Sequence, residues 1–176
     1  MNSIIILFLV LLPTIAFPAA ENTHSFDPTK HCDVIQTCRS YPDSLLYLLS
    51  SFKDLDEGTR SHLLNYLISE NKEYINKRDR FSGITPLAYA AGHRSSPSVE
   101  LLLIAQADPA IKNDQGEDAL LYATRQICDK QGSCENLHLL LQAGARPYTP
   151  SRDGETAFSR AEFEGRQDII DLFNKR

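Results

Sequence analysis

Residues 82–113 read SGITPLAYAAGHRSSPSVELLLIAQADPAIKN, a glycine turn followed by two short stretches of helical character. Gly83 can supply a positive φ at little cost, and Thr85 can cap the first helix through its side-chain oxygen. Pro86 suits the first helical turn, where its missing N–H is not needed. The second stretch has three consecutive leucines at 101–103 and is apolar on more than one face. We expect such a helix to be stable only when neighbouring helices cover it.

The same pattern recurs twice further along the chain. The first stretch, SGITPLAYAA at 82–91, aligns with QGEDALLYAT at 115–124 and with DGETAFSRAE at 153–162. The second stretch, VELLLIAQADP at 99–109, aligns with LHLLLQAGARP at 137–147. Asp118 and Thr156 occupy the capping position of Thr85. This self-similarity predicts a repeat protein in which each helix pair packs on the next.

The period of the repeat is interrupted once. Gly83 and Gly116 are 33 residues apart, whereas Gly116 and Gly154 are 38 residues apart. The five additional residues fall before Leu139, in a segment that we expect to be a lengthened, disulfide-closed loop. Such an insertion lies on a surface where a partner can be met. A neutral length variant is the alternative interpretation.

At these residues the sequence resembles the ankyrin-repeat family. The motif G-x-T-P-L-x-x-A-A is followed by L-L-L-x-x-x-A-D-P at 33-residue spacing, and the similarity covers roughly Ile75 to Arg176. Asp118 and Ala119 depart from it, since the family has Thr-Pro there. The resemblance implies an all-α solenoid of about three to four helix-turn-helix repeats with short β-turn or hairpin connections.

The segments before the first clear repeat complete the predicted organisation. PDSLLYLLSSF at 42–52 and TRSHLLNYLISENKEYIN at 59–76 have leucines at i, i+3 and i+4 spacing and predict two further helices that cap the stack. We divide the chain into a signal peptide (1–20), a cysteine-containing arm (21–40) and a repeat domain (41–176). The domain comprises a capping repeat at 41–75, repeats at 76–113 and 114–151, and a C-terminal capping repeat at 152–176. With both ends capped, we expect a monomer.

The first twenty residues indicate export. An uncharged apolar run from Ile4 to Leu12 precedes Pro13 and a group of small residues, as in a secretory signal peptide cut after Ala16 or Ala20. The run is shorter than the about 20 residues that span a bilayer as a helix. A membrane anchor is the alternative, but we expect a periplasmic or secreted chain with no stable anchor after signal removal.

Four cysteines form two equally spaced pairs, Cys32 with Cys38 and Cys128 with Cys134. An oxidising compartment favours disulfides. Three connectivities are open, and we favour the two local pairings. A zinc site that combines Cys32 and Cys38 with the nearby histidines at 24 and 31 is the alternative, although its spacing matches no common zinc module. We expect no metal and no other cofactor.

Charge and motif content argue against two classes of function. The net charge is −5, and 18 basic residues are interspersed with 23 acidic ones, which argues against binding nucleic acid through its phosphates. The five histidines fall in no motif that pairs one with a nucleophile and an orienting carboxylate, and Ser95 and Ser96 beside His93 lack a glycine elbow. We therefore expect no enzyme. Thiol redox chemistry or hydrolysis is the alternative.

The resemblance implies that the turns and the exposed side of the first helices bind another protein. The positions that map onto this surface are Phe81, Ser82, Ile84, His93, Asp114, Gln115, Glu117, Arg125, Gln126, Arg152, Glu155 and Phe163. Phe81 and Ile84 are the expected anchors, because exposed apolar groups beside arginine are typical of interfaces. Alternatively, Phe81 folds down over the first helix pair. Tyr89 and Tyr122 are expected to pack between adjacent first helices.

The sequence thus predicts a non-enzymatic module that binds and modulates a partner protein. An inhibitor or immunity protein, or a helper of a periplasmic enzyme, would suit a small exported binder. A secreted host-directed effector is the alternative.

Overall fold

The structure, a computed structural model of the chain, describes residues 36, 56–70, 72–93, 96–130 and 134–175, without side chains at 127–130. The predictions on the signal peptide, on the arm with Cys32 and Cys38, and on a helix at 42–52 lie outside these residues. Within the described ranges there are seven α-helices and one short 3-10 helix, and no strand.

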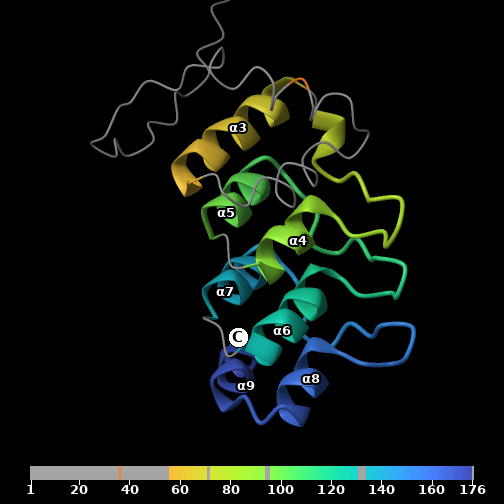
Figure 1. Cartoon of the computed structure of the whole chain (residues 1–176). Helices are drawn as coiled ribbons and strands as arrows, with labels where there is room; N and C mark the ends of the chain where they lie inside the picture. Colours follow the sequence, from red (N-terminus) through yellow and green to blue (C-terminus); the bar gives the residue numbers. More distant parts are fainter. Residues whose placement is uncertain (1–35, 37–55, 71, 94–95, 131–133, 176) are drawn as a thin grey trace, which may run out of the picture.

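The helices form two parallel rows (Figure 1). The inner row consists of α4 (Pro86–Gly92), α6 (Ala119–Lys130) and α8 (Ala157–Phe163). The outer row consists of α3 (Glu57–Glu70), α5 (Ser96–Ile104), α7 (Glu135–Gln142) and α9 (Gln167–Asn174), and the 3-10 helix η2 (Lys72–Tyr74) follows α3. Each inner helix packs on the outer helix of its own repeat, and α6 packs on both α4 and α8. The all-α repeat solenoid predicted from the sequence is confirmed.

The core lies between the two rows and is built from leucine and alanine. Nine leucines are fully buried: Leu63, Leu64, Leu67, Leu87, Leu102, Leu120, Leu121, Leu137 and Leu140. Burying one such side chain stabilises the fold by about 1.5–3 kcal/mol. In α5, Leu102 is fully buried and its neighbours in the leucine run are half-buried, because α3 and α7 cover that helix from both sides. The expectation that the apolar helix needs partners is confirmed.

Small residues set how closely the inner helices approach one another. Ala90, Ala91 and Ala123 are buried in the contact between α4 and α6. A Cβ added to Gly92 would lie only 2.8 Å from the ring of Tyr122. This proximity shows that Tyr122 packs against α4, as the sequence predicts.

Each inner helix begins at the predicted cap. The Thr85 hydroxyl accepts a hydrogen bond from the backbone N–H of Ala88 at 3.2 Å, and Asp118 Oδ1 accepts one from Leu121 at 2.9 Å. Thr156 and Ser159 form a reciprocal capping box. Removing one such cap typically costs about 1 kcal/mol. Just before the caps, the turn glycines at 83, 116 and 154 have φ of 69°, 79° and 79°, the left-handed conformation that the sequence predicts.

The five additional residues lengthen a helix, so the prediction of a loop is wrong for this part of the insertion. Helix α6 has 12 residues, whereas α4 and α8 have seven each. Helix α4 ends at Gly92, and the equivalent position in α6 is Arg125, a good helix former. The chain therefore continues as a helix through Cys128, whose side chain is outside the described residues.

Cys134 lies just before α7 and is a free thiol in the structure. Its Sγ donates a hydrogen bond to Asp168 Oδ2 at 3.3 Å. Burial, followed by the hydrogen bond to Asp168 and the charge of that carboxylate, raises the pKa of the Cys134 thiol to about 11. The proposed pairing with Cys128 stays a prediction.

Candidate functional site

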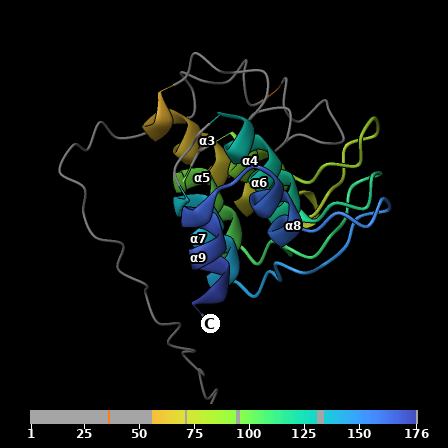
Figure 2. The ribbon, with the colours of Figure 1, turned by 90° about the horizontal axis from the view of Figure 1, so that it is seen from below.

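Three turns project from one side of the helix rows, as Figures 1 and 2 show from two directions. We call residues 79–84 the first turn, 113–117 the second and 151–155 the third. Each is closed by a backbone hydrogen bond of 2.8–2.9 Å from its first residue to its last. Successive turns are also joined, since Asp114 N–H donates to Ser82 O at 2.9 Å and Arg152 N–H donates to Gln115 O at 3.0 Å. The turns therefore form one continuous edge with fixed spacing.

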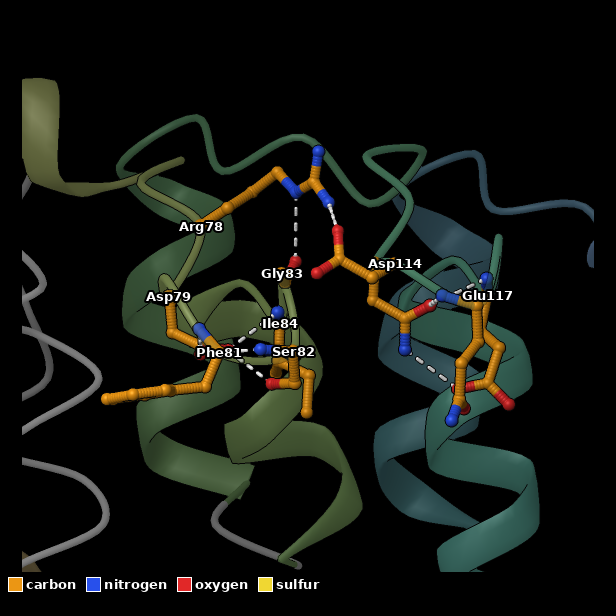
Figure 3. A network of polar contacts seen from close by, with 10 residues as sticks. Arg78, Asp79, Phe81, Ser82, Gly83, Ile84, Asp114 and Glu117 are labelled. Carbon is orange, nitrogen blue, oxygen red and sulfur yellow. Dashed lines mark hydrogen bonds and ion pairs between the residues drawn. The ribbon is translucent and has the colours of Figure 1, made fainter.

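The carboxylate of Asp79 organises the first turn (Figure 3). Its Oδ1 accepts hydrogen bonds from Phe81 N at 2.7 Å and Ser82 N at 2.9 Å, and its Oδ2 accepts from Ile84 N at 2.8 Å and from the Ser82 hydroxyl. Burial raises the pKa of the Asp79 carboxyl, but the hydrogen bonds outweigh it and hold the pKa below its usual value. The tip is thus fixed by the chain itself. An aspartate at a turn is the sequence signal for this role, and it was not predicted.

Asn113 performs the same function in the second turn. Its Oδ1 accepts hydrogen bonds from Gln115 N at 3.0 Å and Glu117 N at 2.9 Å. The partners stand two and four residues after Asn113, whereas in the first turn Ser82 and Ile84 stand three and five residues after Asp79. The first turn therefore has one residue more than the second.

The additional residue carries an aromatic ring out of the turn. Between Asp79 and the joining residue Ser82, the first turn has both Arg80 and Phe81, where the second turn has only Asp114. The side chain of Phe81 is 83% exposed, and its ring extends away from the second turn (Figure 3). The Arg80 guanidinium carbon lies 5.0 Å from the ring centroid. Phe81 therefore does not fold down onto the helices, and that alternative is wrong.

Arg78 joins the first and second turns. Its Nε donates to Gly83 O at 3.1 Å, and its guanidinium forms an ion pair with Asp114. Gly83 has a φ of 69°, which favours glycine, and a Cβ at this position would also displace the Arg78 guanidinium. Asp114 is a predicted binding residue. Its Oδ1 pairs with Arg78, but the residue as a whole is exposed. The role of Arg78 was not predicted.

Glu117 does not project from its turn, and that prediction is wrong. The residue is only 4% exposed, accepts a hydrogen bond from Asn113 Nδ2 at 2.7 Å and forms an ion pair with Arg125. Arg125 Nε also lies 3.7 Å from Glu155 Oε2, which in turn lies near Arg160. These charges pair with one another across adjacent repeats. The ion pairs of Arg125 and Glu155, two predicted binding residues, thus connect neighbouring repeats.

Ile84 is likewise less available than predicted. It is half-buried and packs against the core, because its backbone N–H points to Asp79 and its side chain follows the turn inward. Ser82 is half-buried as well, and its hydroxyl donates to Asp79. Of the residues expected to anchor a partner in the first turn, Phe81 is the one that the structure exposes.

The ends of the inner helices place His93 and Phe163 on the surface. The His93 ring stacks on Tyr89 with centroids 3.9 Å apart, and its Nδ1 lies 2.9 Å from the Tyr89 carbonyl oxygen. Burial raises the pKa of Tyr89, because packing between the helices disfavours the phenolate. Phe163 is 82% exposed, with the Arg160 guanidinium 5.9 Å from its ring centroid. Among the other predicted residues, Gln115 and Arg152 are exposed and Gln126 is half-buried.

A groove of about 400 Å³ opens on the outer row, away from the turns. It is lined by Glu57, Ser96, Pro97, Glu100, Glu135 and Leu139. Glu57 forms an ion pair with Arg60. The Ser96 hydroxyl donates to Glu135 at 3.0 Å. Over the described part of the chain, no group of three or more His, Cys, Asp and Glu side chains is placed to hold a metal ion, and no helix is long and apolar enough to cross a bilayer.

Comparison with known proteins identifies similar repeats elsewhere. A family model described as "Ankyrin repeats (3 copies)" matches residues 55–151. Ankyrin repeat and SOCS box protein 6 from Pongo abelii is 34% identical over 87 residues, and that from Homo sapiens is 33% identical, in both cases over 48% of this chain. The matched part is 21% of the length of each relative. An ankyrin repeat domain from Acinetobacter baumannii AYE, known from its crystal structure, matches with a TM-score of 0.62 and 25% identity over 74% of this chain and 62% of that one.

Proposed function

The chain belongs to the ankyrin-repeat family, and from that premise we propose that it is an exported module that binds a partner protein and alters its activity or stability without chemistry of its own. Ankyrin repeats indicate protein–protein interaction, and the family is generally a non-enzymatic scaffold. The fold does not determine the partner or its role, which depend on the surface residues of this chain.

The observation that carries the proposal is the exposed ring of Phe81 on a turn that the Asp79 carboxylate fixes through four hydrogen bonds. Large aromatic side chains dominate the binding energy of protein interfaces. A rigid tip loses little conformational freedom on binding, so more of the contact energy appears as affinity. The turn edge and the inner-helix ends present Phe81, Arg80, Gln115, His93 and Phe163 on this surface.

The proposed location follows from the apolar run at 4–12 and from the two equally spaced cysteine pairs, which suit an oxidising compartment. In that setting a small binder acts as an inhibitor or immunity protein, or as a helper of a periplasmic enzyme. Non-reducing peptide mapping of the protein recovered from outside the cytoplasm tests both location and pairing. Recovery of an uncleaved chain from the cytoplasm alone, with all four thiols reduced, would contradict the proposed export.

A crosslinking experiment tests the binding surface. The full-length protein carries a photo-reactive phenylalanine analogue in place of Phe81 or, as a control, of Ile104 at the end of α5, which is 54% exposed on the outer row. We expect a discrete crosslinked partner from position 81 and none from position 104. Affinity capture with Phe81→Ala should lose that partner, with about 30-fold weaker binding for a hot-spot residue. Equal crosslinking from both positions would remove the turn edge as the binding site.

A further inference from the structure

The first turn, together with the two residues before it, differs in charge from the other two turns. Residues 77–81 read KRDRF, and Lys77, Arg78 and Arg80 are all exposed on a chain whose net charge is −5. The one acidic residue of this segment, Asp79, is buried, and its two carboxylate oxygens accept four hydrogen bonds from the turn itself. The surface of the first turn is therefore locally positive.

The tips of the second and third turns do not share this character. The second tip consists of Asp114 and Gln115, and the third consists of Arg152 and Asp153. Asp114 also neutralises part of the charge of Arg78. The positive surface is thus largest at the first turn and the two residues before it, because the second turn is preceded by the single exposed Lys112, whose Nζ donates to Pro150 O at 2.7 Å, and Arg152 of the third tip stands beside Asp153.

The ring of Phe81 is not needed for the joining of the turns, although the Phe81 N–H donates to Asp79 Oδ1. The backbone bond from Asp114 to Ser82 reproduces the bond from Arg152 to Gln115, although the second turn has no residue equivalent to Phe81. The additional residue therefore leaves the hydrogen bond between the first and second turns unchanged. What it adds is an apolar ring in water with a guanidinium 5.0 Å from its centroid.

From this combination we infer the chemistry of the partner, on the premise of the proposed binding function. The first turn binds an acidic protein segment, in which an apolar side chain packs on Phe81 and flanking carboxylates pair with Arg80 and Lys77. Arginine binds carboxylates through paired hydrogen bonds, and an aromatic ring gains most from apolar contact. Charge complementarity of this kind steers association and selects against wrong partners.

A nucleic acid fits the surface less well than an acidic segment. A phosphate backbone needs basic groups over several successive contacts. The exposed charges next along this edge are Asp114, Arg152 and Asp153, and the two carboxylates would repel a phosphate backbone while Arg152 alone would attract it. An acidic peptide of a few residues covers the first turn alone and avoids both.

The test is selection of random 12-residue peptides displayed on phage against the immobilised full-length protein, followed by fluorescence anisotropy with the selected peptides. We expect the peptides to share an apolar residue flanked by Asp or Glu. Their affinity should fall about 10- to 30-fold for Phe81→Ala and by a similar factor for Arg80→Glu. Raising the salt concentration should weaken binding, since charges exposed at the surface are screened over about 10 Å at 0.1 M.

Two control variants separate this inference from a general effect. Ile104→Ala removes an exposed apolar side chain of the outer row, and Arg146→Glu makes the same charge change as Arg80→Glu on an exposed arginine beyond α7. Both should leave peptide affinity within about twofold, because rim or remote substitutions act weakly on an interface.

The outcomes distinguish the inference from the proposed function. If the selected peptides are basic or uncharged, or if acidic peptides bind Phe81→Ala as well as the unaltered protein, the acidic-partner inference is wrong while a binding module remains. If anionic vesicles of phosphatidylcholine and phosphatidylserine bind through Phe81 and no acidic peptide is selected, the partner is a membrane surface and the inference falls. If no peptide is selected and position 81 gives no crosslink, both proposals fall.

Discussion

Deleting Phe81 should leave the repeat stack folded, because the deletion converts the first turn into a copy of the second. Ser82 and Ile84 would then stand two and four residues after Asp79, the spacing at which Asn113 accepts hydrogen bonds from its own turn. The bonds from Ser82 and Ile84 to Asp79 can therefore be kept. The bond from Asp114 N–H to the Ser82 carbonyl should also be kept, because the second and third turns form the same bond, from Arg152 N–H to the Gln115 carbonyl, without the extra residue.

The magnitude follows from what the deletion removes. The hydrogen bond from Phe81 N to Asp79 at 2.7 Å is lost, at a net cost of about 0.5–1.5 kcal/mol. The contact with Arg80 at an exposed site contributes about 0.5–1 kcal/mol. One fewer residue has to be ordered, which returns about 1–2 kcal/mol of backbone entropy. The free energy of unfolding should therefore change by no more than about 1.5 kcal/mol.

Urea unfolding followed by circular dichroism at 222 nm measures this change, since the chain has no tryptophan to report by fluorescence. Deletion of Gln115 is the matched control, because it shortens a turn that has no residue to spare. That variant loses the bonds from Gln115 to Asn113 and from Arg152 to Gln115, and it also moves Glu117 out of the spacing at which its N–H reaches Asn113. After the same return of backbone entropy it should still be destabilised by about 1–2 kcal/mol more than the Phe81 deletion. A loss above about 3 kcal/mol on deleting Phe81, or equal losses in both variants, would refute the equivalence of the two turns.

Three further predictions concern the core, the turns and the thiol. Leu140→Ala, at a fully buried site in α7, should lower the free energy of unfolding by about 2–5 kcal/mol, as measured by urea titration. Gly116→Ala should destabilise more than Gly154→Ala in the same assay: both glycines have φ of 79°, but a Cβ at Gly116 would lie 2.7 Å from a backbone nitrogen of the third turn, whereas no atom lies within 4 Å at Gly154. With its pKa raised to about 11, Cys134 of the reduced protein should react with iodoacetamide at pH 8 about 200-fold more slowly than an ordinary thiol. Asp168→Asn should accelerate that reaction, which mass spectrometry of the Cys134 peptide can follow. An unchanged rate in this variant would contradict the prediction.

The helix pairs and their caps could be predicted from the sequence because they depend on local chemistry. Glycine at positive φ, a side-chain oxygen two residues later and a leucine-rich second helix recur at a fixed period. Each of these features acts through residues within one or two turns of the chain. Their recurrence then specifies the stacking, since an apolar helix face has to be covered by its neighbours.

The length of α6 was not predicted because periodicity locates an insertion without stating its conformation. The cysteines at 128 and 134 predict a disulfide-closed loop, whereas the interrupted period alone is equally compatible with a longer helix. The segment from Arg125 onward lacks the glycine at which α4 ends, and helix propensity then favours continuation. A comparison of the residues at which the first helices end would predict the longer α6, whereas the repeat length alone does not.

Exposure of the turn residues depends on contacts between repeats, which spacing does not reveal. Glu117 and Ile84 occupy equivalent positions, yet Glu117 is buried because Arg125 and Asn113 are both placed to pair with it. Phe81 is exposed for the opposite reason, since its backbone N–H takes part in the turn but its ring does not. An alignment on the glycines conceals this difference. The extra residue lies between Asp79 and Gly83, so it displaces only Asp79 relative to Asn113. The hydrogen bonds of Asp79 and Asn113 locate the shift, and they identify the residue of the first turn that is left for a partner to contact.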